Sequence, residues 1–154
     1  MASATATLNR RGTSEIYIGG AGDTRTRLVA AYAEARQRDF AHEAHHDAHY
    51  FPHYALRRIL NLARQHADAG RTLILVGHSW GGDTALRVLK ALQPRRVDLL
   101  VCVDPVPKSR LNPPPTPRNA RRIIHVDARP SHPNRSDQVK EMGQWFGGTL
   151  RRRL

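Results

Sequence analysis

The stretch TLILVGHSWGGDTALRVLKALQP, residues 72–94, constrains the fold more than any other part of the chain. An apolar run leads into Gly77-His78-Ser79-Trp80-Gly81, and an amphipathic segment follows. The run predicts a buried strand over 72–77, and the segment over 82–94 predicts a helix that Pro94 ends. The chain must therefore turn sharply from strand to helix around the serine, and side chains at positions 77 and 81 would clash in such a turn.

Apolar runs and helical patterns alternate along the rest of the sequence. Runs without polar alternation predict strands buried on both faces, which are typical of a parallel sheet covered by helices. We expect strands at 15–20, near 48–51, at 72–77, 97–104 and 122–128, and helices at 24–39, 54–70, 82–94 and 136–146. The predicted fold class is α/β, a three-layer, open and mainly parallel sheet of about five strands with helices on both faces.

The length of 154 residues fits one domain. We expect a flexible tail at 1–13, a single domain over 14–150 and a basic tail at 151–154, with a proline-rich loop at 112–117. No run approaches the roughly 18 apolar residues of a membrane span, and the N-terminus has no apolar signal-peptide block. These features predict a cytoplasmic protein, or one exported without a cleaved signal peptide.

The formal net charge is +12, and 22 of the 25 basic residues are arginine. Such a charge favours anionic partners, including an anionic membrane surface. The arginines are spread along the chain without interleaved aromatic residues, so nucleic acid is a less favoured partner. The single cysteine, Cys102, lies in an apolar run and is interpreted as a core residue.

The serine turn has a chemical interpretation and a structural one. A serine forced into this turn projects from the top of the sheet, where the backbone N–H of Trp80 and the following helix N-terminus can stabilise an oxyanion. Alternatively, Gly77-His78-Ser79-Trp80-Gly81 is a glycine turn without chemistry. GGAGDT at 19–24 suggests a dinucleotide fingerprint, but Arg25 stands where its third glycine should be.

The segment LVGHSWGGDTA resembles the nucleophile elbow of the α/β-hydrolase fold, in its lipase, esterase and thioesterase branch. YIGGAGD (17–23) is similar to the glycine turn after that fold's first strand, and LLVCVDPVP (99–107) and IIHVDARPSHPNRSDQV to its later strands and loops. The resemblance spans 15 to about 146 and implies a minimal core of the fold, short or truncated at its C-terminal end. It implies a serine hydrolase that forms an acyl-enzyme on Ser79, with Gly20 and Ala21 beside the second oxyanion donor, and no cofactor or metal.

The resemblance implies that the triad residues occur along the chain in the order serine, acid, histidine. Asp104 is the expected acid, and its alternative role is that of a turn aspartate at a strand end. Asp127 and Asp137 are the other candidates for the acid. His132, in a loop that leaves a strand's carboxyl end, is the expected base, whereas His125 lies inside a strand.

A histidine-rich segment precedes the second long helix and comprises His42, His45, His46, His49 and His53. If the segment were helical, histidines three or four residues apart would share a face and could bind zinc. It is otherwise a polar segment near the cleft that lends one histidine to catalysis, or a loosely ordered surface stretch. The side chain of His78 is expected to point away from the serine.

The favoured function is hydrolysis of a carboxylic ester, either a small molecule or a lipid. In that case the proline-rich loop and the histidine segment would shape the acyl pocket. The alternative is a catalytically degenerate binding module that keeps the fold and lacks a complete triad. A basic nucleic-acid-binding protein is the third hypothesis.

Overall fold

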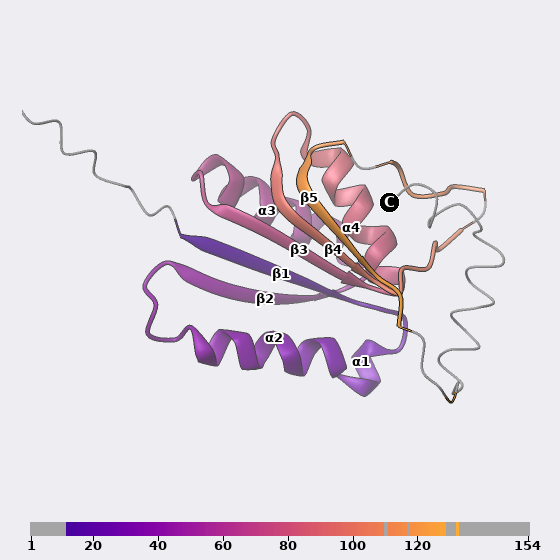
Figure 1. Ribbon diagram of the computed structural model, residues 1–154, viewed down its shortest axis with the longest axis horizontal. Helices are drawn as coiled ribbons and strands as arrows, with labels where there is room; N and C mark the ends of the chain where they lie inside the picture. The colour runs from indigo at the N-terminus through magenta and orange to yellow at the C-terminus, as the bar shows by residue number, and fades with distance from the viewer. Residues whose placement is uncertain (1–11, 110, 117, 129–131, 133–154) are drawn as a thin grey trace, which may run out of the picture.

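The computed structural model describes residues 12–109, 111–116, 118–128 and 132. Within them, five parallel strands form one sheet in the order β2-β1-β3-β4-β5 (Figure 1). The elements are β1 (Thr13–Gly19), α1 (Asp23–Thr26), α2 (Leu28–Asp39), β2 (His46–Pro52), α3 (Leu56–Asp68), β3 (Thr72–His78), α4 (Trp80–Leu92), β4 (Val97–Val103) and β5 (Ala120–Val126). The predicted parallel α/β sheet of about five strands is confirmed.

Helices lie on both faces of the sheet. α3 and α4 pack together on one face, and α2 packs on the other against β1 and β2 (Figure 1). The main core forms between the sheet and the α3–α4 layer, where Ile16, Leu75 and Leu100 meet Ile59 and Leu89, all fully buried. Each such side chain contributes roughly 1.5–3 kcal/mol when it leaves water. The three-layer arrangement therefore rests on the apolar runs that predicted it.

The helix predicted over 24–39 is interrupted. Arg27 has a φ of 55° in the left-handed region and separates the short α1 from α2. Asp23, only 4% exposed, accounts for the new start, because its carboxylate accepts hydrogen bonds from the backbone N–H groups of Val29 (2.8 Å) and Ala30 (3.3 Å). Asp23 therefore caps α2 from across the intervening turn.

Other boundaries differ less from the predicted ones. β2 is longer than the strand expected near 48–51, and α4 begins at Trp80, two positions before the expected start. Thr13 belongs to β1, so the tail predicted over 1–13 ends before it. Residues 1–11 of that tail, the helix predicted over 136–146 and the basic tail at 151–154 lie outside the described residues. No described helix has the length and apolar character needed to cross a bilayer.

The strand order reverses beside β1. The chain passes from β1 outward to β2, and then returns to place β3 on the other side of β1. The helices that follow β1 and β3 consequently lie on opposite faces of the sheet (Figure 1). In open α/β sheets, ligands bind at the carboxyl ends of the two strands where the order reverses in this way. Gly20 and Ser79 are the first residues after the two strands, and both therefore lie at this point.

Candidate active site

Ser79 occupies a strained turn between β3 and α4. Its φ of 54° and ψ of −122° are unfavourable for any residue with a side chain. A Cβ at Gly77 would lie 2.5 Å from the carbonyl oxygen of Gly81, and a Cβ at Gly81 would lie 2.1 Å from the carbonyl oxygen of Ile18. The turn therefore has room for glycine alone at both flanking positions, on the steric ground that the sequence suggested.

Backbone hydrogen bonds hold the serine in this conformation. The Ser79 N–H donates to the carbonyl of Val103 (3.0 Å), and the Ser79 carbonyl accepts from the N–H groups of Gly82 (2.9 Å) and Val106 (3.2 Å). These contacts tie the turn to the end of β4 as well as to the first turn of α4. Trp80 is the first residue of α4, so its N–H belongs to the unpaired group at the positive end of the helix dipole.

The segment after β1 borders the serine from the other side. A Cβ at Gly20 would lie 2.8 Å from the Cβ of Ser79 and 3.3 Å from its Oγ. Gly20 is therefore needed for the close approach of these two segments. Ala21 follows at the surface, exposed to solvent. The structure thus brings Gly20 and Ser79 together, and Ala21 lies next to them along the chain.

Asp104 lies at the end of β4, on the same edge of the sheet. It has a φ of 43°, and its backbone N–H donates to the carbonyl of Val126 (2.8 Å). Its carboxylate oxygen Oδ1 accepts a hydrogen bond from the N–H of Ala128 (2.8 Å). These are the contacts of the turn aspartate that the sequence offered as an alternative, and they join the ends of β4 and β5. A role as the acid stays a prediction.

The other candidates for acid and base are less fully described. Asp127 is half-buried, and Asp137 lies outside the described residues. His132 is exposed, and its neighbours 129–131 and 133–154 also lie outside the described residues. His125 belongs to β5, as expected, beside Cys102 of β4 in the register. His132 follows Ala128, the residue that is bonded to Asp104, by four positions along the chain.

His53, which the sequence offered only as one of the five histidines of its segment, lies at this edge of the sheet. It follows Pro52, the last residue of β2, and its ring lies edge-on to Trp80 with centroids 5.1 Å apart. Its Nδ1 is buried with no hydrogen-bond partner among the described residues. Burial, together with the nearby charge of Lys108, lowers the pKa of the His53 imidazole, which favours its neutral form. Its position directly after the carboxyl end of a strand was the available signal.

A buried polar network supports the segment after β4. Asp83 of α4 is fully buried, and its carboxylate accepts hydrogen bonds from Arg87 Nε (2.5 Å) and from the backbone N–H of Lys108 (3.0 Å). Lys108 Nζ donates to Thr84 Oγ1 (2.6 Å) and to the carbonyl of His53 (2.8 Å). The network therefore joins the segments after β2 and β4 to the helix that follows Ser79.

The histidine segment is not helical where the zinc hypothesis required it. Residues 46–52 form β2, in which alternate side chains face opposite sides of the sheet. His46 stacks on Phe40 beside α2, whereas His49 lies against His66 of α3. The grouping of histidines three or four residues apart on one helix face is therefore wrong.

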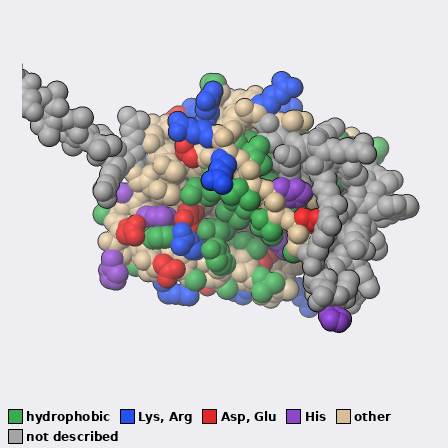
Figure 2. Space-filling model, viewed as in Figure 1, with side chains coloured by type: hydrophobic (Ala, Val, Ile, Leu, Met, Phe, Trp, Pro, Cys, Tyr) green, Lys and Arg blue, Asp and Glu red, His purple; other side chains and the backbone are tan. Residues whose placement is uncertain are grey.

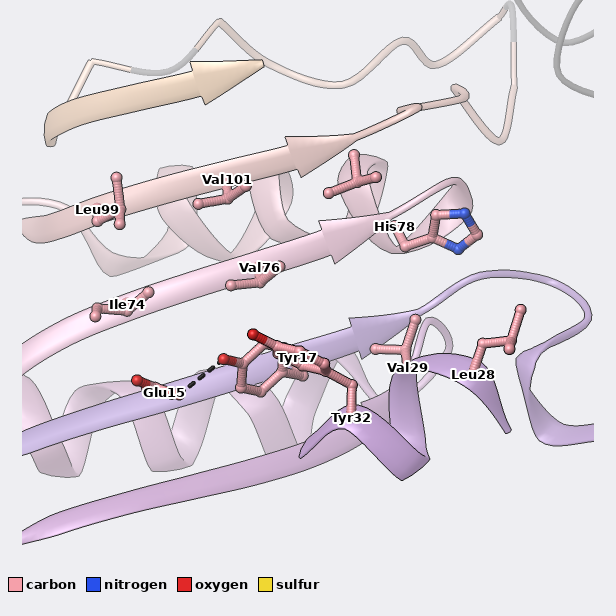
Figure 3. A pocket seen from close by; sticks show the side chains of 11 residues that line it. Glu15, Tyr17, Leu28, Val29, Tyr32, Ile74, Val76, His78, Leu99 and Val101 are labelled. Atoms are coloured by element: carbon pink, nitrogen blue, oxygen red, sulfur yellow. Dashed lines mark hydrogen bonds between the residues drawn. The ribbon is translucent and has the colours of Figure 1, made fainter. Parts of the chain in front are cut away.

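An apolar groove with a volume of about 520 Å³ runs along the α2 face of the sheet. Figure 2 shows hydrophobic side chains gathered at the centre of this face, with lysine and arginine side chains spread at several places around them. The groove is lined by Ile74, Val76, Leu99, Val101 and Val103 of β3 and β4, by Glu15 and Tyr17 of β1, by Leu28, Val29 and Tyr32 of α2, and by His78 (Figure 3). His78 therefore borders the groove at the end of β3 nearest the serine.

Comparison with known proteins agrees with this architecture. The family model for the alpha/beta hydrolase fold matches residues 20–129, more than half of the chain. No curated protein and no solved structure matches the sequence. The matched range begins at the glycine beside Ser79 and extends past β5, so it includes the switch point and the whole turn. The chain belongs to the alpha/beta hydrolase fold family.

Proposed function

We propose that the protein is a serine hydrolase that cleaves a carboxylic ester through an acyl-enzyme on Ser79. The observation that carries the proposal is the strained conformation of Ser79, at the N-terminus of α4 and with Gly20 against its side chain. Serine nucleophiles of this fold occupy such a strand-to-helix turn, which exposes the hydroxyl at the top of the sheet.

The same geometry supports an oxyanion hole. The N–H of Trp80 belongs to the positive end of α4, and the Gly20–Ala21 backbone lies on the other side of the serine. Two N–H donors that converge on the oxygen of a tetrahedral intermediate stabilise it far more strongly in a crevice than in water. In the proposed mechanism Ser79 attacks the ester carbonyl, the alcohol leaves, and water then releases the acid.

We assign Asp104 as the acid and His132 as the base that accepts the Ser79 proton. The position of Asp104 supports this assignment, because Asp104 joins the ends of β4 and β5 and His132 comes soon after β5 in the sequence. His53 is the competing base, because its ring packs on Trp80 and its Nδ1 has no hydrogen-bond partner among the described residues.

The test is covalent labelling with a fluorophosphonate probe, followed by mass spectrometry of the adduct. We expect labelling of the wild-type protein at Ser79, none of Ser79→Ala, and a loss of at least about 100-fold in labelling rate for His132→Gln. A rate lost in His53→Gln and retained in His132→Gln would transfer the role of base to His53. A folded protein that resists the probe would support a catalytically degenerate binding module.

We further propose that the ester is a small molecule or a lipid presented at an anionic membrane surface. The support is the net charge of +12, since each basic residue near an anionic surface adds about 1 kcal/mol of attraction. Hydrolysis of p-nitrophenyl esters of increasing acyl length defines the acyl preference. Co-sedimentation with phosphatidylserine vesicles that weakens with salt, and none with phosphatidylcholine vesicles, is the expected surface result.

A further inference from the structure

A second cluster of chemically active side chains lies at the opposite edge of the sheet from Ser79. Asp47 and His49 stand two positions apart near the start of β2 and therefore point to the same face. His66 comes from the last turn of α3, the helix that packs on that face. The rings of His49 and His66 lie with centroids 5.7 Å apart.

The three side chains converge closely enough to share one ion. One ligand atom of each lies within 4.8 Å of the other two, and His49 Nε2 is 3.0 Å from Asp47 Oδ1. In a tetrahedral zinc site with bonds of about 2.0–2.1 Å, neighbouring ligand atoms are separated by roughly 3.3 Å. Small side-chain rotations would therefore bring this cluster to coordinating distances.

Two further residues orient these ligands. Arg71 Nη1 lies 2.7 Å from Asp47 Oδ2, so the guanidinium holds one carboxylate oxygen and the other oxygen faces His49. Ser14 Oγ lies 2.6 Å from His66 Nδ1, in a buried contact. Outer contacts of this kind fix the orientation of metal ligands in known sites.

The composition of the cluster selects among metals. The charge of Arg71 offsets that of Asp47, which disfavours Ca²⁺ and Mg²⁺, because these ions rely on several oxygen ligands. Two imidazoles and one carboxylate suit the late divalent ions of the first transition row. We propose that Asp47, His49 and His66 bind one such ion, with Zn²⁺ as the representative case, and that the ion links β2 to α3.

The test is titration of the untagged full chain, freed of metal with a chelator, with Zn²⁺ in a calorimeter. We expect one equivalent bound by the wild-type protein, and binding at least tenfold weaker in Asp47→Asn and in His49→Ala. His42→Ala is the matched control, because His42 is an exposed histidine of the same segment outside the cluster. Binding that persists in both ligand variants, or that is lost in the control, would overturn the proposal.

Thermal unfolding is a second measurement, and it tests the proposal in variants whose folding the substitution alters. Zn²⁺ should raise the melting temperature of the wild-type protein and of His42→Ala, and leave that of His49→Ala unchanged. His66→Gln tests the buried ligand, with circular dichroism to verify its fold. In Ser79→Ala the zinc stoichiometry should be unchanged, since the two sites lie at opposite edges of the sheet. A melting temperature that responds to Zn²⁺ equally in wild type and His49→Ala would contradict the assignment.

Discussion

At Ser79 the backbone carries strain that the proposed chemistry requires. A residue with a Cβ at φ 54° and ψ −122° costs on the order of 1–3 kcal/mol, and it persists because three backbone hydrogen bonds hold it there. Glycine adopts this region without the penalty, although it loses more entropy on folding. We therefore expect Ser79→Gly to raise the free energy of unfolding by about 1 kcal/mol while it abolishes hydrolysis.

Ser79→Ala is the matched control for that prediction. Alanine removes the hydroxyl and keeps the Cβ, so its free energy of unfolding should stay within about 0.5 kcal/mol of the wild-type value. Urea denaturation of the three proteins measures both differences. Equal stability of the glycine and alanine variants would show that the strain at Ser79 is not a significant part of the folding energy.

At the scale of elements, Asp23 decides where α2 begins. Its carboxylate is the acceptor for the N–H groups of Val29 and Ala30, which otherwise would have no partner in the first turn of the helix. We expect Asp23→Ala to lower the free energy of unfolding by about 1–2 kcal/mol in urea denaturation. Asp39→Ala, at the exposed end of the same helix, should be neutral or slightly stabilising, because an acidic residue there opposes the helix dipole.

Glu15 of β1 makes the sheet sensitive to acid. Its carboxylate is almost fully buried and accepts hydrogen bonds from Arg36 (2.7 and 3.0 Å) and from the Tyr17 hydroxyl (2.7 Å). Burial opposes ionisation, but the hydrogen bonds outweigh it and lower the pKa of Glu15 below its usual value of 4.5. This contribution to stability is full above pH 4.5 and disappears as the pH falls through the lowered pKa.

The corresponding variant is Glu15→Gln. We expect it to lower the free energy of unfolding by about 3 kcal/mol at pH 7, since it breaks a buried ion pair. The difference from wild type should shrink as the pH falls below 4.5. Glu34→Gln, which breaks the exposed pair with Arg27, should cost less than about 1 kcal/mol. A difference at Glu15 that does not change between pH 7 and pH 3 would rule out the titration.

The elements that the sequence predicted well are those that one local pattern determines. The apolar runs of β3 and β4 indicated buried strands, and the spacing of Gly77 and Gly81 indicated the turn. The break at Arg27 was not predictable from periodicity, because it depends on the contact of Asp23 with N–H groups six and seven residues later. The polar composition of β2 concealed the length of the strand predicted near 48–51, since pairing with β1 extends it over His46–Pro52.

Long-range contacts of the candidate site were equally hidden in the sequence. The glycines around Ser79 follow from the turn itself, and a parallel sheet alone places Asp104 at the same edge. The convergence of His53, Asp83 and Lys108 depends on how the segments after β2 and β4 reach α4. No spacing along the chain encodes that arrangement, because the three residues are brought together by the order of the strands.

At the scale of the whole molecule, Lys108 connects the segments after β2 and β4 to α4, the helix that follows Ser79. Its ammonium group joins Thr84 of α4 to the carbonyl of His53, and its backbone N–H joins the carboxylate of Asp83. Burial lowers the pKa of Lys108, because the charged ammonium group loses solvation there. The segment from 103 to 108 is therefore held at both ends. Backbone hydrogen bonds join Val103 and Val106 to Ser79, and the contacts of Lys108 hold its far end.

We expect Lys108→Met to separate stability from function. Loss of two side-chain hydrogen bonds is offset by removal of the desolvation cost, so the free energy of unfolding should change by less than about 1 kcal/mol. The segment that carries Asp104 should nevertheless shift relative to Ser79, and a displacement of about 1 Å near the reacting groups reduces rates up to 100-fold. The labelling rate of Ser79 with a fluorophosphonate should therefore fall at least tenfold.

Lys90→Met, on the exposed side of α4, should leave that rate unchanged. An unchanged labelling rate in a stable Lys108→Met protein would show that the turn holds Ser79 in place without help from the segment after β4.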